Sequence, residues 1–141
     1  VVYDLTAGWM RYPGPGGTTT DTILNFENLT VGGAADVTGT DGNNVITITD
    51  TGAFHDNTIN GLGGNDTVSS GLGNDTINAG AGADSVLAGD GDDLVVDDDI
   101  PAGDVFDGGA GTDTLVADIT WNTGVTYNLS AGWMRWKQRW P

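Results

Sequence analysis

Apolar, acidic and glycine positions repeat every nine residues in the middle of this chain. Residues 61–96 read GLGGNDTVS, SGLGNDTIN, AGAGADSVL and AGDGDDLVV, four blocks without a gap. In each block the eighth position is apolar and β-branched, the sixth is an acid and the fourth is glycine. These residues are Val68, Ile77, Val86 and Val95, then Asp66, Asp75, Asp84 and Asp93, then Gly64, Gly73, Gly82 and Gly91. Three position rules that hold over four copies define a structural repeat.

The composition of one block predicts a tight turn followed by a very short strand. A segment so rich in glycine does not form a helix, because each glycine costs about 1 kcal/mol there relative to alanine. Glycine does permit positive φ angles and hence a tight turn, and a β-branched residue favours a strand. Two blocks, 18 residues, then form one coil, and the eighth positions stack as parallel strands about 4.8 Å apart. We therefore predict an all-β, right-handed parallel β-roll, a solenoid with short flanking hairpins.

The acids follow the same stacking. Blocks two apart lie on one side of the solenoid, so Asp66 is expected near Asp84, and Asp75 near Asp93. Residues 12–134 contain no lysine or arginine to neutralise them. A divalent cation between the turns would neutralise the aspartates. Aspartate oxygens and turn carbonyls are ligands that suit Ca²⁺. The alternative is that these aspartates only cap backbone amides of their own turns.

We expect each calcium ion to take two aspartates and about four turn carbonyls, because Ca²⁺ accepts at least about six oxygens. The candidate ligands are Asp66, Asp75, Asp84, Asp93, Asp104 and Asp113, together with Gly64, Gly73, Gly82, Gly91, Gly111, Ala79, Ala81, Ala88 and Asp90.

The repeat GGxGxDxUx, in which U is a large apolar residue, resembles the RTX (hemolysin-type) calcium-binding nonapeptide. The four blocks match it at positions 4, 6 and 8 and depart from it at position 1, which is Gly61, Ser70, Ala79 and Ala88. The resemblance implies a secreted or cell-surface bacterial protein. Such proteins leave the cell through type I secretion machinery and fold where external Ca²⁺ is plentiful.

Weaker copies of the repeat lie on both sides. GTDGNNVIT (39–47) and GAFHDNTIN (52–60) carry Asn44 and Asn57 in place of the acid, which predicts weak or absent Ca²⁺ binding. DIPAGDVFD (99–107) and GGAGTDTLV (108–116) restore the acid as Asp104 and Asp113. The acidic run at 97–99 either adds ligands or forms a solvated loop. We place the β-roll at residues 39–116, between an N-terminal flank (1–38) and a C-terminal flank (117–141).

The two flanks share a sequence. VVYDLTAGWMRY from Val1 and VTYNLSAGWMRW from Val125 agree at eight of twelve positions, 124 residues apart. Each copy predicts a strand, a turn and a second short strand, and PGPGGTTT (13–20) predicts a loop because of its breaker residues. Either the chain spans one long repeat and the start of the next, or each copy caps one end of the solenoid.

Composition narrows the function. A net charge of −16 makes nucleic acid a poor partner, and no apolar run is long enough to span a membrane. Without cysteine, and with His55 as the single histidine, no nucleophile and base pair is indicated, so we predict no enzyme activity. The sequence favours a structural, calcium-binding part of an adhesin or tandem-repeat surface protein. The alternative is an accessory module of a secreted hydrolase.

Partners other than calcium are indicated by the ends of the chain. The C-terminal flank combines tryptophan with Arg135, Lys137 and Arg139. Such a combination favours stacking on the sugars of a surface polysaccharide. The shared flank sequence instead favours neighbouring repeats of the same protein.

Overall fold

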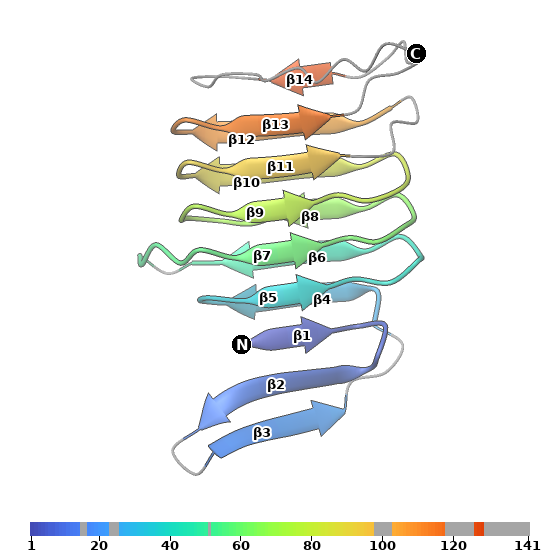
Figure 1. The fold of residues 1–141 in the computed structure, drawn as a ribbon, viewed down its shortest axis with the longest axis vertical. Coiled ribbons are helices and arrows are strands. Elements are labelled where there is room, and N and C mark those ends of the chain that lie inside the picture. The colour runs from blue at the N-terminus through green and yellow to red at the C-terminus, as the bar shows by residue number, and fades with distance from the viewer. Residues whose placement is uncertain (15–16, 23–25, 51, 98–102, 118–125, 129–141) are drawn as a thin grey trace.

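In the computed structural model, two β-sheets built mainly of parallel strands face each other along the length of the solenoid (Figure 1). It describes residues 1–14, 17–22, 26–50, 52–97, 103–117 and 126–128, and none of these is helical. Sheet A has the strand order β13-β11-β9-β7-β5-β1-β2-β3, and sheet B has the order β14-β12-β10-β8-β6-β4. From β4 onward the chain alternates between the sheets, so that each pair of strands closes one coil. The predicted all-β parallel solenoid is confirmed.

The strands are short, as the nine-residue blocks predict. Sheet A contains β1 (Val2–Asp4), β2 (Trp9–Gly14), β3 (Gly17–Thr22), β5 (Asp36–Thr38), β7 (Thr58–Asn60), β9 (Thr76–Asn78), β11 (Leu94–Asp97) and β13 (Thr114–Ala117). Sheet B contains β4 (Asn28–Gly32), β6 (Val45–Thr49), β8 (Thr67–Ser69), β10 (Ser85–Asp90), β12 (Val105–Ala110) and β14 (Thr126–Asn128).

The strand register measures the length of each coil. In the regular part, Val68 pairs with Val86 and Ile77 with Val95, a step of 18 residues. The step from Ile46 to Val68 is 22 residues, and the step from Val86 to Phe106 is 20. The insertions therefore enlarge the turns and leave the stacking of the strands unchanged.

The core is a thin column of side chains between the sheets. The eighth position of every block is buried, and the residues there are Ile46, Ile59, Val68, Ile77, Val86, Val95, Phe106 and Leu115. Their neighbours at the seventh position lie on the outer face of the strands, which gives the burial pattern exposed–buried–intermediate in β7, β8 and β9. Because the core is one side chain deep on each sheet, most backbone in the turns lies close to backbone of the next coil.

The N-terminal flank forms a hairpin at one end of sheet A. β1 pairs in parallel with β5 and antiparallel with β2, and β2 pairs with β3 from Trp9↔Thr22 to Gly14↔Gly17. The loop expected at 13–20 is therefore wrong: Pro13 and Thr18 are paired within the hairpin. Pro13 lies in β2 past Arg11, the last residue of that strand that pairs with β1, so only β3 is paired beside it and the lack of an N–H donor is tolerated. Of the C-terminal flank, β14 pairs in parallel with β12, and residues 129–141 lie outside the described residues.

Gly82 shows how closely the coils pack. A Cβ atom at Gly82 would collide with the carbonyl oxygen of Gly64 in the coil before it, and its φ is +142°. Gly52, in the enlarged turn before β7, also has positive φ (+88°) but has no atom within 4 Å of a Cβ. Substitutions at Gly52 and Gly82 therefore separate the energetic cost of a left-handed backbone conformation from the cost of a steric clash between coils.

We expect Gly52→Ala to lower the free energy of unfolding by about 1–2 kcal/mol, the cost of the left-handed conformation. Gly82→Ala should lower it by a further amount of about 1–3 kcal/mol, because the two coils are forced apart. Urea unfolding in saturating Ca²⁺ measures both. Equal losses in the two variants would contradict close packing of the coils.

Candidate metal centre

The sixth-position side chains stack in two columns, one on each side of the solenoid. The first column is Asn44, Asp66, Asp84 and Asp104, and the second is Asn57, Asp75, Asp93 and Asp113. Within each column, Oδ1 of one carboxylate accepts the backbone N–H of the residue one coil earlier. In the first column Asp84 accepts from Asp66 at 2.8 Å, and in the second Asp93 accepts from Asp75 at 2.8 Å. The structure thus brings together the aspartates that the nine-residue period places on the same side.

These bonds bear on the alternative that the aspartates only cap backbone amides of their own turns. The aspartates do cap backbone amides, but the amides belong to the neighbouring coil rather than to their own turn. Asp104 and Asp113 continue the two columns, with N–H···Oδ1 distances of 2.9 and 3.1 Å, in spite of the insertion before them. One carboxylate oxygen of each aspartate is therefore used by the stack.

In four of the column aspartates the second carboxylate oxygen has no such partner. Oδ2 of Asp66, Asp75, Asp93 and Asp113 is buried and accepts no hydrogen bond, and each of these residues is at most 3% exposed. Burial of an ionised carboxylate without a donor or counter-charge is strongly unfavourable. Buried unsatisfied oxygens stacked in two columns are what a cation between the coils would satisfy.

Burial also changes the acidity of these groups. It raises the pKa of Asp66 to about 6, against the hydrogen bond from the Asn44 amide and together with repulsion from Asp84. Burial likewise raises the pKa of Asp93 to about 6, and the charges of Asp75, Asp113 and Asp92 add to the effect. The metal-free columns therefore hold protons more tightly than ordinary carboxylates do.

Backbone carbonyl oxygens line the turns that hold the aspartates, and one of them lies next to the free oxygen of Asp66. A Cβ at Gly61 would collide with both Asp66 Oδ2 and the carbonyl oxygen of Ala79, so these two oxygens border the same small space. The fourth-position carbonyls of Gly64, Gly73 and Gly91 point at the glycine one coil later, namely Gly82, Gly91 and Gly111. Aspartate and carbonyl oxygens in this arrangement are the donor set that Ca²⁺ prefers.

The other predicted ligands lie in the same turns. The Ala88 carbonyl accepts the Ser70 hydroxyl at 2.6 Å, and the Asp90 carbonyl accepts the Gly73 amide at 2.8 Å. Ala81 pairs with Gly63 of the previous coil. The described residues contain no group of three or more acid, histidine or cysteine side chains that could hold a metal. A site here would therefore need backbone carbonyls as well as two aspartates.

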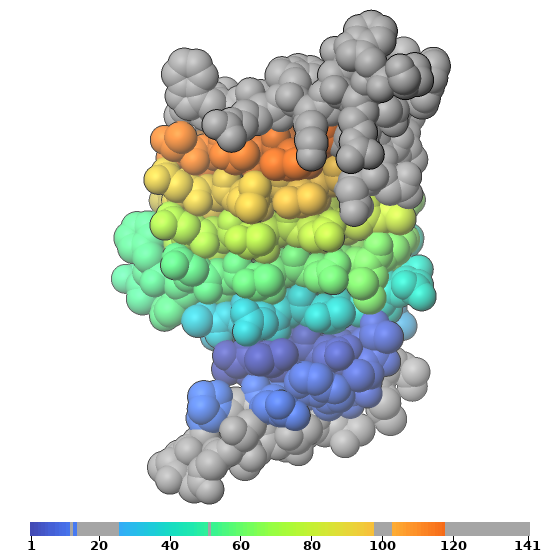
Figure 2. Space-filling model, in the orientation of Figure 1, coloured from blue at the N-terminus to red at the C-terminus, as the bar shows by residue number. Residues whose placement is uncertain are grey.

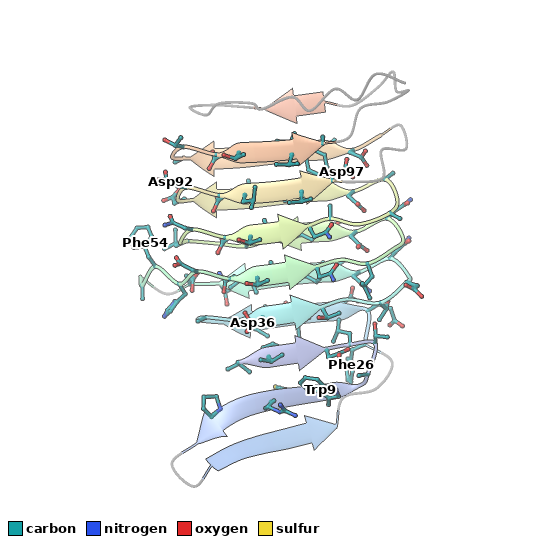
Figure 3. The ribbon with its side chains drawn as sticks, viewed as in Figure 1. Trp9, Phe26, Asp36, Phe54, Asp92 and Asp97 are labelled. Carbon is teal, nitrogen blue, oxygen red and sulfur yellow. The ribbon has the colours of Figure 1, made fainter. Side chains whose placement is uncertain are left out.

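The acidic run at 97–99 is only partly a loop. Asp97 belongs to β11, pairs in register with Ala117 and is 2% exposed. Asp98 and Asp99 lie outside the described residues. A fully solvated loop is therefore wrong for Asp97, whose place at the end of a strand turns its side chain into the stack (Figure 3).

A second set of ladders lies outside the two columns and was not predicted. It uses the fifth position of the blocks, and the side chain of the earlier coil accepts the backbone N–H of the later one. The pairs are Asn43 with Asn65, Asn65 with Ala83, Asp56 with Asn74, Asn74 with Asp92, and Asp92 with Thr112, at 2.8–3.0 Å. The signal in the sequence is the asparagine or aspartate that directly precedes most sixth positions. These bonds join the coils without any metal.

The raised pKa values give the metal-free chain an unusual pH dependence. A carboxyl with a raised pKa in the folded state stabilises the fold below its unfolded pKa, about 4, and loses that contribution as the pH rises through about 6. In EDTA we expect the β signal in circular dichroism to fall between roughly pH 4 and pH 7. Asp66→Asn should flatten this slope. Asp41→Asn, the same change at an exposed position, should not.

A β signal in EDTA that rises with pH would contradict the raised pKa values. In Ca²⁺ the direction should reverse, because protons and metal ions compete for the same oxygens. The apparent Ca²⁺ affinity should therefore fall as the pH drops below about 6.

Comparison with known proteins agrees with this geometry. A family model described as the RTX calcium-binding nonapeptide repeat (4 copies) matches residues 51–77, 69–96 and 103–119. No curated protein and no solved structure matches the chain. The described residues include no helix that is long and apolar enough to cross a membrane. The stacked nonapeptides, the parallel solenoid and the family match together identify this region as an RTX β-roll domain, a calcium-binding repeat module.

Proposed function

We propose that this domain binds several Ca²⁺ ions in its two aspartate columns and folds when it binds them, as a structural module of a secreted or cell-surface bacterial protein. The observation that carries the proposal is the row of buried carboxylate oxygens without a hydrogen-bond donor, on Asp66, Asp75, Asp93 and Asp113. Bound Ca²⁺ supplies the positive charge that these oxygens lack. The aspartates and turn carbonyls supply the ligands.

Metal-coupled folding suits export. Inside a cell, where free Ca²⁺ is scarce, the net charge of −16 and the buried carboxylates oppose compaction. The chain then stays unfolded for passage through type I secretion machinery and folds outside, where ion binding contributes its free energy to folding. The role is mechanical rather than catalytic. The single histidine, His55, contacts Asp50 at 2.9 Å in an enlarged turn.

The shared flank sequence supports a place in a tandem array. Val2–Asp4 forms β1, and the matching residues Thr126–Asn128 form β14. β1 pairs in parallel with β5, which follows it, and β14 pairs in parallel with β12, which precedes it. The same sequence therefore pairs with the coil that follows it at the N-terminus and with the coil that precedes it near the C-terminus. One copy of it would join the last coil of one repeat to the first coil of the next.

The N-terminal end offers a surface for such a junction. An apolar pocket lined by Tyr3, Leu5, Met10, Phe26 and Leu29 opens there, and Phe26 is 56% exposed (Figure 3). The occupant we propose is the C-terminal coil of a preceding repeat. In this chain β2 covers the outer edge of β1, so the hairpin serves as an edge cap that a preceding repeat would replace. This continuity supports the proposal of a structural role in an adhesin or surface array.

Calcium-dependent folding is tested by circular dichroism. In EDTA at neutral pH the chain should be mostly disordered, and millimolar Ca²⁺ should raise the β signal. Mg²⁺ should substitute poorly, because it requires a tight octahedral shell and dehydrates reluctantly. A spectrum that is already fully β in EDTA at pH 7 would overturn metal-coupled folding.

The two columns predict which side chains matter most for metal. Asp84 lies between Asp66 and Asp104, so Asp84→Ala removes an oxygen donor from both neighbouring spaces. We expect it to lose at least one bound Ca²⁺ per chain. Asn44→Ala should lose none, because the Asn44 side chain is engaged with Thr40 of its own turn. Titration calorimetry measures both, and equal losses would contradict the assignment of the first column.

A further inference from the structure

Asn57 occupies the first place in the second column and donates where an aspartate cannot. It is 2% exposed, and its Oδ1 accepts the backbone N–H of Ala35 at 2.9 Å. Its Nδ2 lies 2.8 Å from the carbonyl oxygen of His55, 3.1 Å from that of Ser70 and 2.9 Å from Asp75 Oδ1. One amide nitrogen thus serves three oxygens that belong to two coils.

The same three positions recur one coil later. His55 is at the fourth position of the block that contains Asn57. Ser70 and Asp75 are at the first and sixth positions of the block that stacks on it in the next coil. The equivalents around Asp75 are Gly73, Ala88 and Asp93. Asp75 places Oδ2 where Asn57 places its amide nitrogen, and that oxygen has no hydrogen-bond donor. The three oxygens around Nδ2 of Asn57 therefore mark a point where oxygens converge and positive charge is required.

Ser70 supplies a second internal donor in this column. It is fully buried, and its hydroxyl donates to the carbonyl oxygen of Ala88 at 2.6 Å. The Ala88 carbonyl is one of the predicted calcium ligands, so this oxygen already has a hydrogen-bond donor without the metal. In the first column the matching residue is Gly61, which has no hydroxyl, and its place borders Asp66 Oδ2 and the Ala79 carbonyl.

The first column has no comparable internal donor at its start. The Nδ2 atom of Asn44 donates to the Thr40 hydroxyl at 2.9 Å, within its own turn. Its Oδ1 accepts the Thr40 amide at 2.7 Å. Asn44 and Asn57 are therefore the same residue type at equivalent positions with different contacts, and only Asn57 reaches into the next coil with its amide nitrogen.

We propose that Asn57 takes the place of a calcium ion in the second column and that Ser70 weakens binding of the next ion. The two columns are then unequal. The first binds its ions from Asp66 onward, whereas the place beside Asn57 takes no ion and the place beside Asp75 binds more weakly than the place beside Asp66. This inference rests on calcium binding by the domain.

Asn57→Asp tests the first half of the proposal. The substitution replaces the donor with a carboxylate oxygen and should create a further ion site. Native mass spectrometry of the full chain in saturating Ca²⁺ should count one more ion than in the parent chain. Asn65→Asp is the matched control. It makes the same change at an exposed outer position, where Oδ1 can still accept from Ala83, and should add no ion.

Ser70→Ala tests the second half. It removes the hydroxyl but keeps the Cβ atom that Ala79 and Ala88 have at equivalent positions. Because the metal-free state loses a hydrogen bond, one ion should bind roughly two- to tenfold more tightly. Ser85→Ala, at an exposed strand position, should leave the calorimetric affinities unchanged.

The outcomes separate this inference from calcium binding itself. A parent chain that binds no Ca²⁺ overturns the proposed function. A parent chain that binds Ca²⁺ while Asn57→Asp shows the same ion count, or while Asn65→Asp gains an ion as well, overturns the inference alone. If Asn57→Asp stays unfolded in saturating Ca²⁺, an unchanged affinity in Ser70→Ala overturns it.

Discussion

The stack depends on a hydrogen bond from the backbone of one coil to the aspartate of the next. Each sixth-position carboxylate holds the amide of the coil before it, at 2.8 Å for both Asp66→Asp84 and Asp75→Asp93. A single coil cannot make this bond to itself, so its stability comes from its neighbours, as in other solenoids. The same bond fixes the carboxylates inside the turns and leaves one oxygen of several of them without a donor. Structural order between the coils and demand for a cation therefore have one cause.

Glycine makes that bond geometrically possible. For the aspartate to reach the neighbouring amide, the turns must approach until backbone touches backbone. At Gly82, Gly91 and Gly111 a Cβ would collide with the carbonyl oxygen one coil earlier. Figure 2 shows the outcome, in which successive coils lie directly on one another. The fourth-position glycine thus serves packing between coils as much as the turn itself.

How much of this was predictable depends on how local the signal is. The nine-residue period predicts the parallel solenoid, the core at Val68 and Ile77, and the pairing of Asp66 with Asp84, because each follows from spacing alone. The flanking coils were placed correctly despite steps of 22 and 20 residues, because the buried Ile46 and Phe106 keep the register. The turn insertions alter only the loop length.

Other features could not be read from the nine-residue pattern because they depend on which residues meet in the fold. Pro13 looks like a loop residue, yet it pairs with Thr18 since the hairpin turn falls just beyond it. Asn44 and Asn57 are identical in sequence terms and differ in contacts, because Thr40 is available to one and Ser70 to the other. The fifth-position ladders cannot be predicted from the sequence because asparagine before aspartate is also common in ordinary turns. In each case the role is decided by a partner that the nine-residue period does not specify.

The same geometry explains why the acids of this chain are nearly all aspartate. Nineteen of the twenty acidic residues are aspartate, which solubility alone does not require. A carboxylate one methylene from the Cα atom can cap a nearby backbone amide with few rotamers to lose. Glutamate adds a methylene and a torsion, and its carboxylate would extend past the amide of the adjacent coil. Because successive turns lie in contact, the spacing between coils favours aspartate over glutamate in the two columns.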